Sequence, residues 1–198
     1  MRAMIDRLAS WVGLALAAVL LVGGGLLTWA NAFVADQVAE QLTMQDITMP
    51  EGEALSSLSD TDREALEPFA GSALDTGPEA KAYSEHYILA HMNASSDGRT
   101  YSQVSGEFLQ LSDEEKASAE GQALGQLRQS LFMGNTLRGL LLYGYAFATI
   151  GTIAGWAAVA AFSGATLLLV LAGLGLRHGR REAERAAGFG TERVLVDA

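Results

Sequence analysis

The chain has 198 residues, of which 49% are hydrophobic, a formal net charge of −10 and no cysteine. The absence of cysteine excludes disulfides, thiolate metal sites and cysteine nucleophiles. The length suits one compact domain, or a small domain with membrane segments.

The charges are strongly segregated along the chain. Residues 11–33 and 139–176 contain no charged residue, whereas residues 35–130 carry 18 acidic and 5 basic residues, a local net charge of −13. Uncharged apolar runs of this length are typical of membrane spans, because about 20 helical residues cross a bilayer core. The sequence therefore predicts a mainly α, integral membrane protein with two transmembrane helices and an acidic, mostly helical extracytoplasmic cap.

The first transmembrane helix is predicted over residues 11–34. Trp11 and Trp29 lie near its ends, where interfacial aromatic residues are expected. Arg2 and Arg7 precede it and acidic residues follow it, so the positive-inside rule predicts a cytoplasmic segment at 1–10.

A cleaved signal peptide is the alternative for this region. Ala30-Asn31-Ala32 has the small-x-small pattern of a cleavage site. The apolar run is longer than the usual core of a signal peptide, which favours a retained anchor.

Short helices and turns are expected in the cap. Residues 35–47 extend the first helix, a loop follows over 50–60, and Ser59 to Asp62 begin a helix that stops near Pro68. A further helix starts at Gly77-Pro78, with Tyr83, Tyr87, Ile88 and His91 on one stripe. Asp97-Gly98 favours a turn with positive φ. Ser112 and Glu115 form a capping box that begins one helix leading to the second span, weakened by Gly121, Gly125 and Gly134.

The second transmembrane helix is predicted over residues 153–176, with Trp156 near the outer interface. Residues 177–198 include Arg177, Arg180, Arg181 and Arg185 and should be a cytoplasmic tail, which places 35–152 outside. A hairpin turning at 151–155, giving three spans, is the alternative. Residues 137–151 are expected to form an apolar helix outside the membrane, and such exposed apolar surface usually has a partner.

No catalytic, cofactor-binding or metal-binding residue is predicted. His86 and His91 are five residues apart and point about 140° apart on a helix, which does not suit a zinc pair. The motifs HExxH, GxSxG and DxDxDG are absent. The acidic cap disfavours nucleic acid, because it repels phosphate.

The residues selected as candidates are structural or interaction residues. Gly98 permits the turn, Tyr83 and Tyr101 pack the cap, and His91 pairs with Tyr87. Gly151 and Gly155 allow close helix packing, either between the two spans or in a dimer. Trp11, Trp29 and Trp156 anchor the depth of the spans.

Several short motifs occur in a recognisable order. They are Ile47-Thr48-Met49, Phe69-Ala70-Gly71, the helix with Tyr83 and His91, Gly98-Arg99-Thr100-Tyr101, and the segment from Met133 to Arg138. This order resembles small actinobacterial two-span membrane proteins commonly labelled "aromatic ring-opening dioxygenase". The resemblance implies a two-span protein with an external cap. Extradiol dioxygenases hold iron with two histidines and a carboxylate, and no such trio with suitable geometry occurs in this sequence.

The expected role follows from these features. We expect a plasma-membrane protein with both termini cytoplasmic, acting as a non-catalytic accessory or interaction subunit of a cell-envelope or membrane complex. Its partners would be the lipid bilayer and a membrane protein or a second copy, with no cofactor. A ligand-binding or sensing module is the alternative, and an enzyme that uses His91 and nearby carboxylates is a third.

Overall fold

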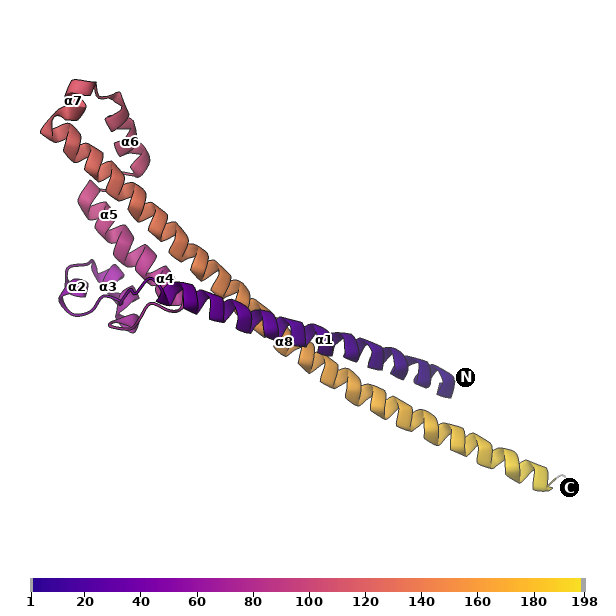
Figure 1. Cartoon of the computed structure of the whole chain (residues 1–198). Coiled ribbons are helices and arrows are strands. Elements are labelled where there is room, and N and C mark those ends of the chain that lie inside the picture. The colour runs from indigo at the N-terminus through magenta and orange to yellow at the C-terminus, as the bar shows by residue number, and fades with distance from the viewer. Residues whose placement is uncertain (1, 197–198) are drawn as a thin grey trace. The chain divides into compact units, whose positions relative to one another are not determined.

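The structure, a computed structural model, describes the backbone of residues 2–196 and the side chains of residues 4–182 and of Glu184. The side chains of Arg2 and Arg185, which contribute to the predicted basic ends, lie outside the described residues. The described residues are mainly helical, which confirms the predicted class, and contain no strand beyond an isolated bridge between Thr48 and Ala73. They form two units: Met1–Ala32 with Thr152–Ala198, here called the helix pair, and Phe33–Gly151, here called the cap unit (Figure 1).

Two of the helices are long and apolar enough to cross a membrane. They are α1 (Arg2–Thr43) and α8 (Ala119–Val196). The other elements are α2 (Glu53–Ser56), α3 (Asp60–Leu66), the 3-10 helix η1 (Glu67–Phe69), α4 (Gly77–Ala82), the π-helix η2 (Tyr83–Ile88), α5 (Leu89–Ser96), α6 (Tyr101–Gln110) and α7 (Asp113–Ala117). Because α8 is continuous, the turn at 151–155 that a three-span hairpin would need is not formed.

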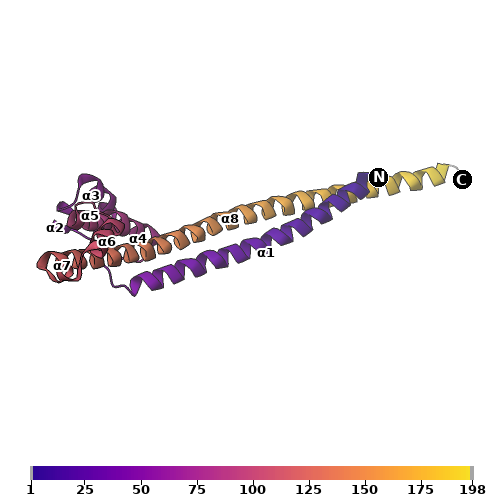
Figure 2. The same ribbon diagram turned by 90° about the horizontal axis from the view of Figure 1, so that it is seen from above.

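The helix pair is antiparallel, with one register from end to end (Figure 2). The register is fixed by glycines that face a residue of the other helix: Gly13 faces Ala172, Gly24 faces Phe162, Gly155 faces Asn31, Gly164 faces Leu20 and Gly175 faces Ser10. Small residues allow helix backbones to approach closely, as they do in membrane helix pairs. This register sets the predicted spans 11–34 and 153–176 level with each other, and Trp29 level with Trp156.

The surface of the helix pair suits a lipid environment. Trp11 and Trp29 are each 65% exposed and Trp156 is 73% exposed, among many exposed aliphatic side chains. The hydroxyls of Thr28 and Ser163 donate to carbonyl oxygens four residues earlier in their own helices, at 2.9 and 2.8 Å. Polar groups satisfied within a helix are what a bilayer core requires.

The register can be tested by a cysteine pair, since the chain has no cysteine of its own. A Cβ at Gly13 would lie 3.5 Å from the Cβ of Ala172, at the short end of the range found in disulfides. We expect Gly13→Cys with Ala172→Cys to form an intramolecular disulfide in membranes under mild oxidation. The pair Gly23→Cys with Ala172→Cys should not do so. Equal yields from both pairs, measured by gel mobility, would contradict the register.

The core of the cap unit joins α1, the loop after it, α3, α4 and α8. Its fully buried members include Met49, Leu66 and Leu74, and Leu141 of α8 is only 2% exposed. The expectation that nothing covers residues 137–151 is therefore wrong for one face of this segment. The opposite face remains exposed.

Two other expectations about the cap need correction. The helix begun by Ser112 and Glu115 does not run into the second span, because α7 ends and Ser118 adopts an extended conformation before α8. The hydroxyl of Ser118 then accepts a hydrogen bond from the backbone N–H of Gly121 at 3.1 Å. Gly121 is needed here, because a Cβ would overlap the carbonyl oxygen of Glu115.

The segment after the Asp97-Gly98 turn is helical rather than extended. Asp97 and Gly98 have φ angles of 52° and 73°, which confirms the predicted turn. Thr100 then caps α6, and its backbone N–H donates to the Gln103 side chain at 2.8 Å. The Thr-x-x-Gln spacing was the signal that could have predicted this helix.

Candidate functional site

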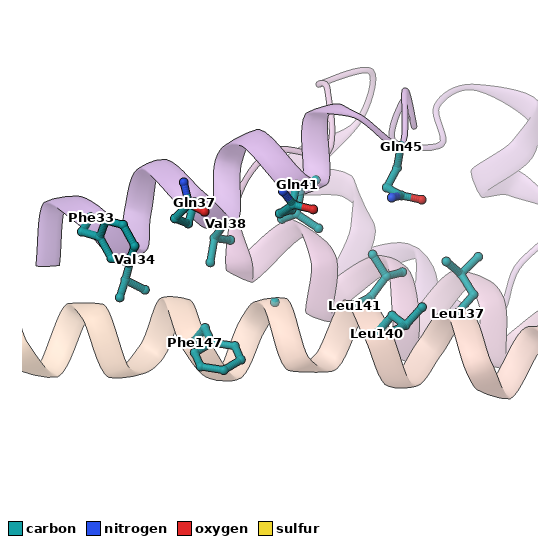
Figure 3. A pocket seen from close by; sticks show the side chains of 12 residues that line it. Phe33, Val34, Gln37, Val38, Gln41, Gln45, Leu137, Leu140, Leu141 and Phe147 are labelled. Atoms are coloured by element: carbon teal, nitrogen blue, oxygen red, sulfur yellow. The ribbon is translucent and has the colours of Figure 1, made fainter. Parts of the chain in front are cut away.

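An apolar groove lies in the cap unit between α1 and α8 (Figure 3). Its volume is about 600 Å³, and its lining contains no charged residue: Phe33, Val34, Gln37, Val38, Gln41, Leu42, Gln45, Leu137, Leu140, Leu141, Gly144 and Phe147. Val38, Leu42 and Leu141 are buried and belong to the core as well. The groove is therefore an opening onto the core rather than a separate cavity.

The two lips of the groove differ in chemistry. On the α8 side, Leu140 and Phe147 are 63% and 56% exposed, and the neighbouring Tyr143 is also exposed. On the α1 side, the exposed residues Asp36 and Glu40 follow the row of glutamines, and the Glu40 carboxylate accepts a weak hydrogen bond from Gln37 at 3.4 Å. One lip is apolar and aromatic, and the other is acidic.

The glutamines of α1 line the groove at a regular interval. Gln37, Gln41 and Gln45 are four residues apart, so they lie along one side of the helix (Figure 3). Amides both donate and accept hydrogen bonds without carrying charge. The groove thus offers apolar contact with a row of neutral polar groups along one wall.

A second feature is the π-helical turn η2, a geometry that occurs often at functional sites. Its widened turn leaves the Ser84 carbonyl oxygen within reach of Arg138 on α8, whose Nε donates to it at 3.0 Å. The buried Ser84 hydroxyl donates in turn to the Arg138 carbonyl oxygen at 3.3 Å. These two bonds fasten η2 to α8.

The stripe of aromatic residues expected on this helix is present. Tyr83 stacks on Tyr87 with ring centroids 4.9 Å apart, and Tyr87 contacts His91 at 4.4 Å. The Nδ1 atom of His91 lies 2.7 Å from the Tyr87 carbonyl oxygen, which confirms the predicted pairing. Burial raises the pKa of the Tyr83 hydroxyl, and Tyr87 raises it further. His91 itself is exposed at the end of the stack.

The histidine that makes a tertiary contact is His86. Its Nδ1 lies 3.0 Å from Oδ1 of Asp62 on α3, and both side chains are mostly buried. Ser59 donates to the other oxygen of Asp62 at 2.6 Å. The hydrogen bond from Ser59 lowers the pKa of Asp62 and His86 lowers it further, while burial opposes both. No local pattern could have linked residues so far apart in the chain.

A small polar cavity adjoins His86. It has a volume of about 340 Å³ and is lined by Lys81, Glu85, His86 and Tyr145, together with Ala65, Pro78 and Ala82. The Lys81 ammonium lies 3.6 Å from the Glu85 carboxylate and 5.4 Å from the centre of the Tyr145 ring. Among the residues that the structure describes, no cluster of three or more His, Asp or Glu side chains could hold a metal ion.

The most heavily hydrogen-bonded carboxylate is Glu79, which is only 7% exposed. It accepts from the hydroxyls of Ser72 and Thr76, both at 2.8 Å, and from the backbone N–H groups of Asp75 and Thr76 at 3.1 and 2.9 Å. Burial alone would raise the pKa of Glu79, but these hydrogen bonds outweigh it and hold the pKa below its ordinary value. Glu79 organises the loop before α4.

The structure does not bring the predicted candidate residues together. In the cap unit, Tyr83 packs on the core, Tyr101 contacts Phe132 with ring centroids 5.8 Å apart, Gly151 is buried, and Gly98 and His91 are exposed. In the helix pair, Gly155 faces Asn31, and the three tryptophans are exposed. The groove was missed, although the exposed apolar character of 137–151 pointed to its α8 wall.

Comparison with protein-family models, curated proteins and solved structures found no match to this chain. The resemblance to the actinobacterial two-span proteins therefore stays a prediction.

Proposed function

We propose that the chain is a non-catalytic accessory subunit of a membrane complex that docks its partner through the groove of the cap unit. In this proposal α1 and α8 cross the plasma membrane over 11–34 and 153–176, both termini are cytoplasmic, and the cap unit is extracytoplasmic. The observation that carries it is the uncharged groove of about 600 Å³.

The composition of the cap unit supports a docking role for this groove. Residues 35–130 have a net charge of −13, yet the groove is lined by apolar and amide side chains only. Leu140, Tyr143 and Phe147 extend the apolar area onto the surface of α8. Contiguous apolar surface of this kind is typical of interaction sites.

A ligand-binding or sensing module is the second candidate. The cavity beside His86 favours it, because a histidine fixed by Asp62 and a lysine line the same space. This cavity is smaller than the groove, and its charged groups are already paired with one another.

Photo-crosslinking from the groove tests the docking proposal. A photoreactive phenylalanine analogue at Leu140 or Phe147, in native membranes, should trap a protein in an adduct of one defined mass. The same analogue at Leu109, which is 64% exposed on α6 outside the groove, should not. Mass spectrometry of the adducts identifies what was trapped.

The control position decides the interpretation. Equal crosslinking from Leu109 would indicate non-specific contact, and adducts with lipid alone from Leu140 and Phe147 would assign the groove to lipid. Either result would contradict a protein-docking role.

A further inference from the structure

We infer that the occupant of the groove is an amphipathic helix of a partner protein, with an apolar face for the groove and basic residues facing the α1 lip. This inference rests on the proposed docking function and adds the chemistry of the partner.

The dimensions of the groove fit a helix. Its α1 wall runs from Phe33 to Gln45, a length of about 18 Å or roughly three helical turns. An amphipathic helix that lies in such a groove is anchored by apolar residues at i, i+3 or i+4, and i+7. Leu140, Gly144 and Phe147 of α8 follow the same spacing and give these anchors an apolar wall.

The charge of the lips selects a basic partner. Asp36 and Glu40 border the α1 side, whereas the exposed residues of the α8 lip are the uncharged Leu140, Tyr143 and Phe147. A bound helix would therefore bury its apolar face in the groove and turn one flank towards carboxylates. Complementary charge at the rim of an interface steers association and selects the partner.

The same charges disfavour two other occupants. A second copy would set one acidic cap against another, each with a net charge of −13 over residues 35–130. A lipid acyl chain would cover the amides of Gln37, Gln41 and Gln45 without offering hydrogen bonds, and a buried amide without a partner is costly.

Model peptides test the inference on the full-length protein in phosphatidylcholine nanodiscs. The probe is a labelled helical peptide of about five turns, with leucines on one face and lysines on the other. Its twin carries glutamates in place of the lysines. Binding is measured by fluorescence anisotropy, with empty nanodiscs as background. The lysine peptide should bind at least about tenfold more tightly than its twin at low salt, and the difference should shrink as salt is added.

Substitutions locate the binding. Leu140→Asn and Phe147→Asn should each weaken the lysine peptide several-fold, whereas Leu109→Asn should not. Asp36→Lys combined with Glu40→Lys should abolish the preference for the lysine peptide. Glu53→Lys combined with Glu64→Lys changes the net charge equally at exposed positions outside the groove lining and should leave the preference largely intact.

Three outcomes would overturn the inference: equal binding of the two peptides, equal effects of the two double variants, or a phospholipid that co-purifies with the wild type and is lost in Leu140→Asn. If crosslinking from Leu140 and Phe147 still traps a protein, the docking function stands and only the basic helix is rejected. If crosslinking also fails, the docking function is rejected with it.

Discussion

Replacing Glu79 with alanine should lower the free energy of unfolding of the cap unit by about 3 kcal/mol. The substitution leaves two hydroxyls and two backbone N–H groups without their acceptor in a buried position, and hydrogen bonds to a charged group contribute about 1.5–3 kcal/mol each. Water entering the space left by the side chain would recover part of this loss. Glu64→Ala, at an exposed position on α3, should cost much less.

The contribution of Glu79 should depend on pH in a definite direction. Its pKa in the folded protein lies below the ordinary value of 4.5, so the folded state binds protons less readily than the unfolded chain. The stabilisation is therefore complete above pH 4.5 and is lost as the pH falls through the folded-state pKa. We expect the difference in stability between wild type and Glu79→Gln to shrink over that range, and a difference that grows on acidification would contradict this assignment.

The distribution of aromatic residues provides the readout for both experiments. All five tyrosines lie in Phe33–Gly151, and all three tryptophans lie in the helix pair. Near-ultraviolet circular dichroism from tyrosine therefore follows the cap unit, while tryptophan fluorescence follows the helix pair. Unfolding of the cap unit should be visible in the first signal without a matching change in the second.

Replacing Gly77 with leucine should disrupt the packing of α4 against α8. A Cβ at Gly77 would lie 2.5 Å from the Cβ of Ala148 and 3.5 Å from Cα of Tyr145, so there is no room for a larger side chain. Overpacking in a core costs about 1–3 kcal/mol, and more where backbone must move. We expect a loss of at least about 3 kcal/mol, measured by thermal unfolding through the tyrosine signal.

Two controls separate this clash from a general effect of removing a glycine. Gly139→Leu, also in the cap unit, introduces its side chain where nothing lies within 4 Å and should be neutral or stabilising, because leucine favours helix. Gly77→Ala should be rescued in part by Ala148→Gly, since the two methyl groups compete for one space. Simple additivity of these two substitutions would argue against the predicted contact.

The sequence predicted the elements that depend on local chemistry. Charge segregation identified the two long apolar helices, the capping box at Ser112 and Glu115 is present, and Asp97-Gly98 forms its turn. Each of these depends on residues close together in the chain, where spacing alone determines the interaction.

The features that were missed depend on contacts between distant residues. The π turn is held by Arg138, and His86 is held by Asp62. Neither partner could be identified without knowing how α3, η2 and α8 pack. The break at Ser118 was missed for the same reason, because Gly121 was interpreted only as a weak helix former and not as the point where α7 and α8 meet. The groove likewise requires the placement of α1 beside α8 within the cap unit.

The π turn at Tyr83–Ile88 restricts how the length of this chain can vary among its relatives. A protein lacking one residue in this segment could close the turn as an ordinary α-helix, but everything after the deletion would rotate by about 100° around the helix axis relative to what precedes it. Met92, whose sulfur would lie 2.6 Å from a Cβ at Gly134, could then no longer face that glycine while His86 still reached Asp62. Homologues that share this cap should therefore keep the number of residues between Asp62 and Met92, or change the small residue at position 134 together with the deletion.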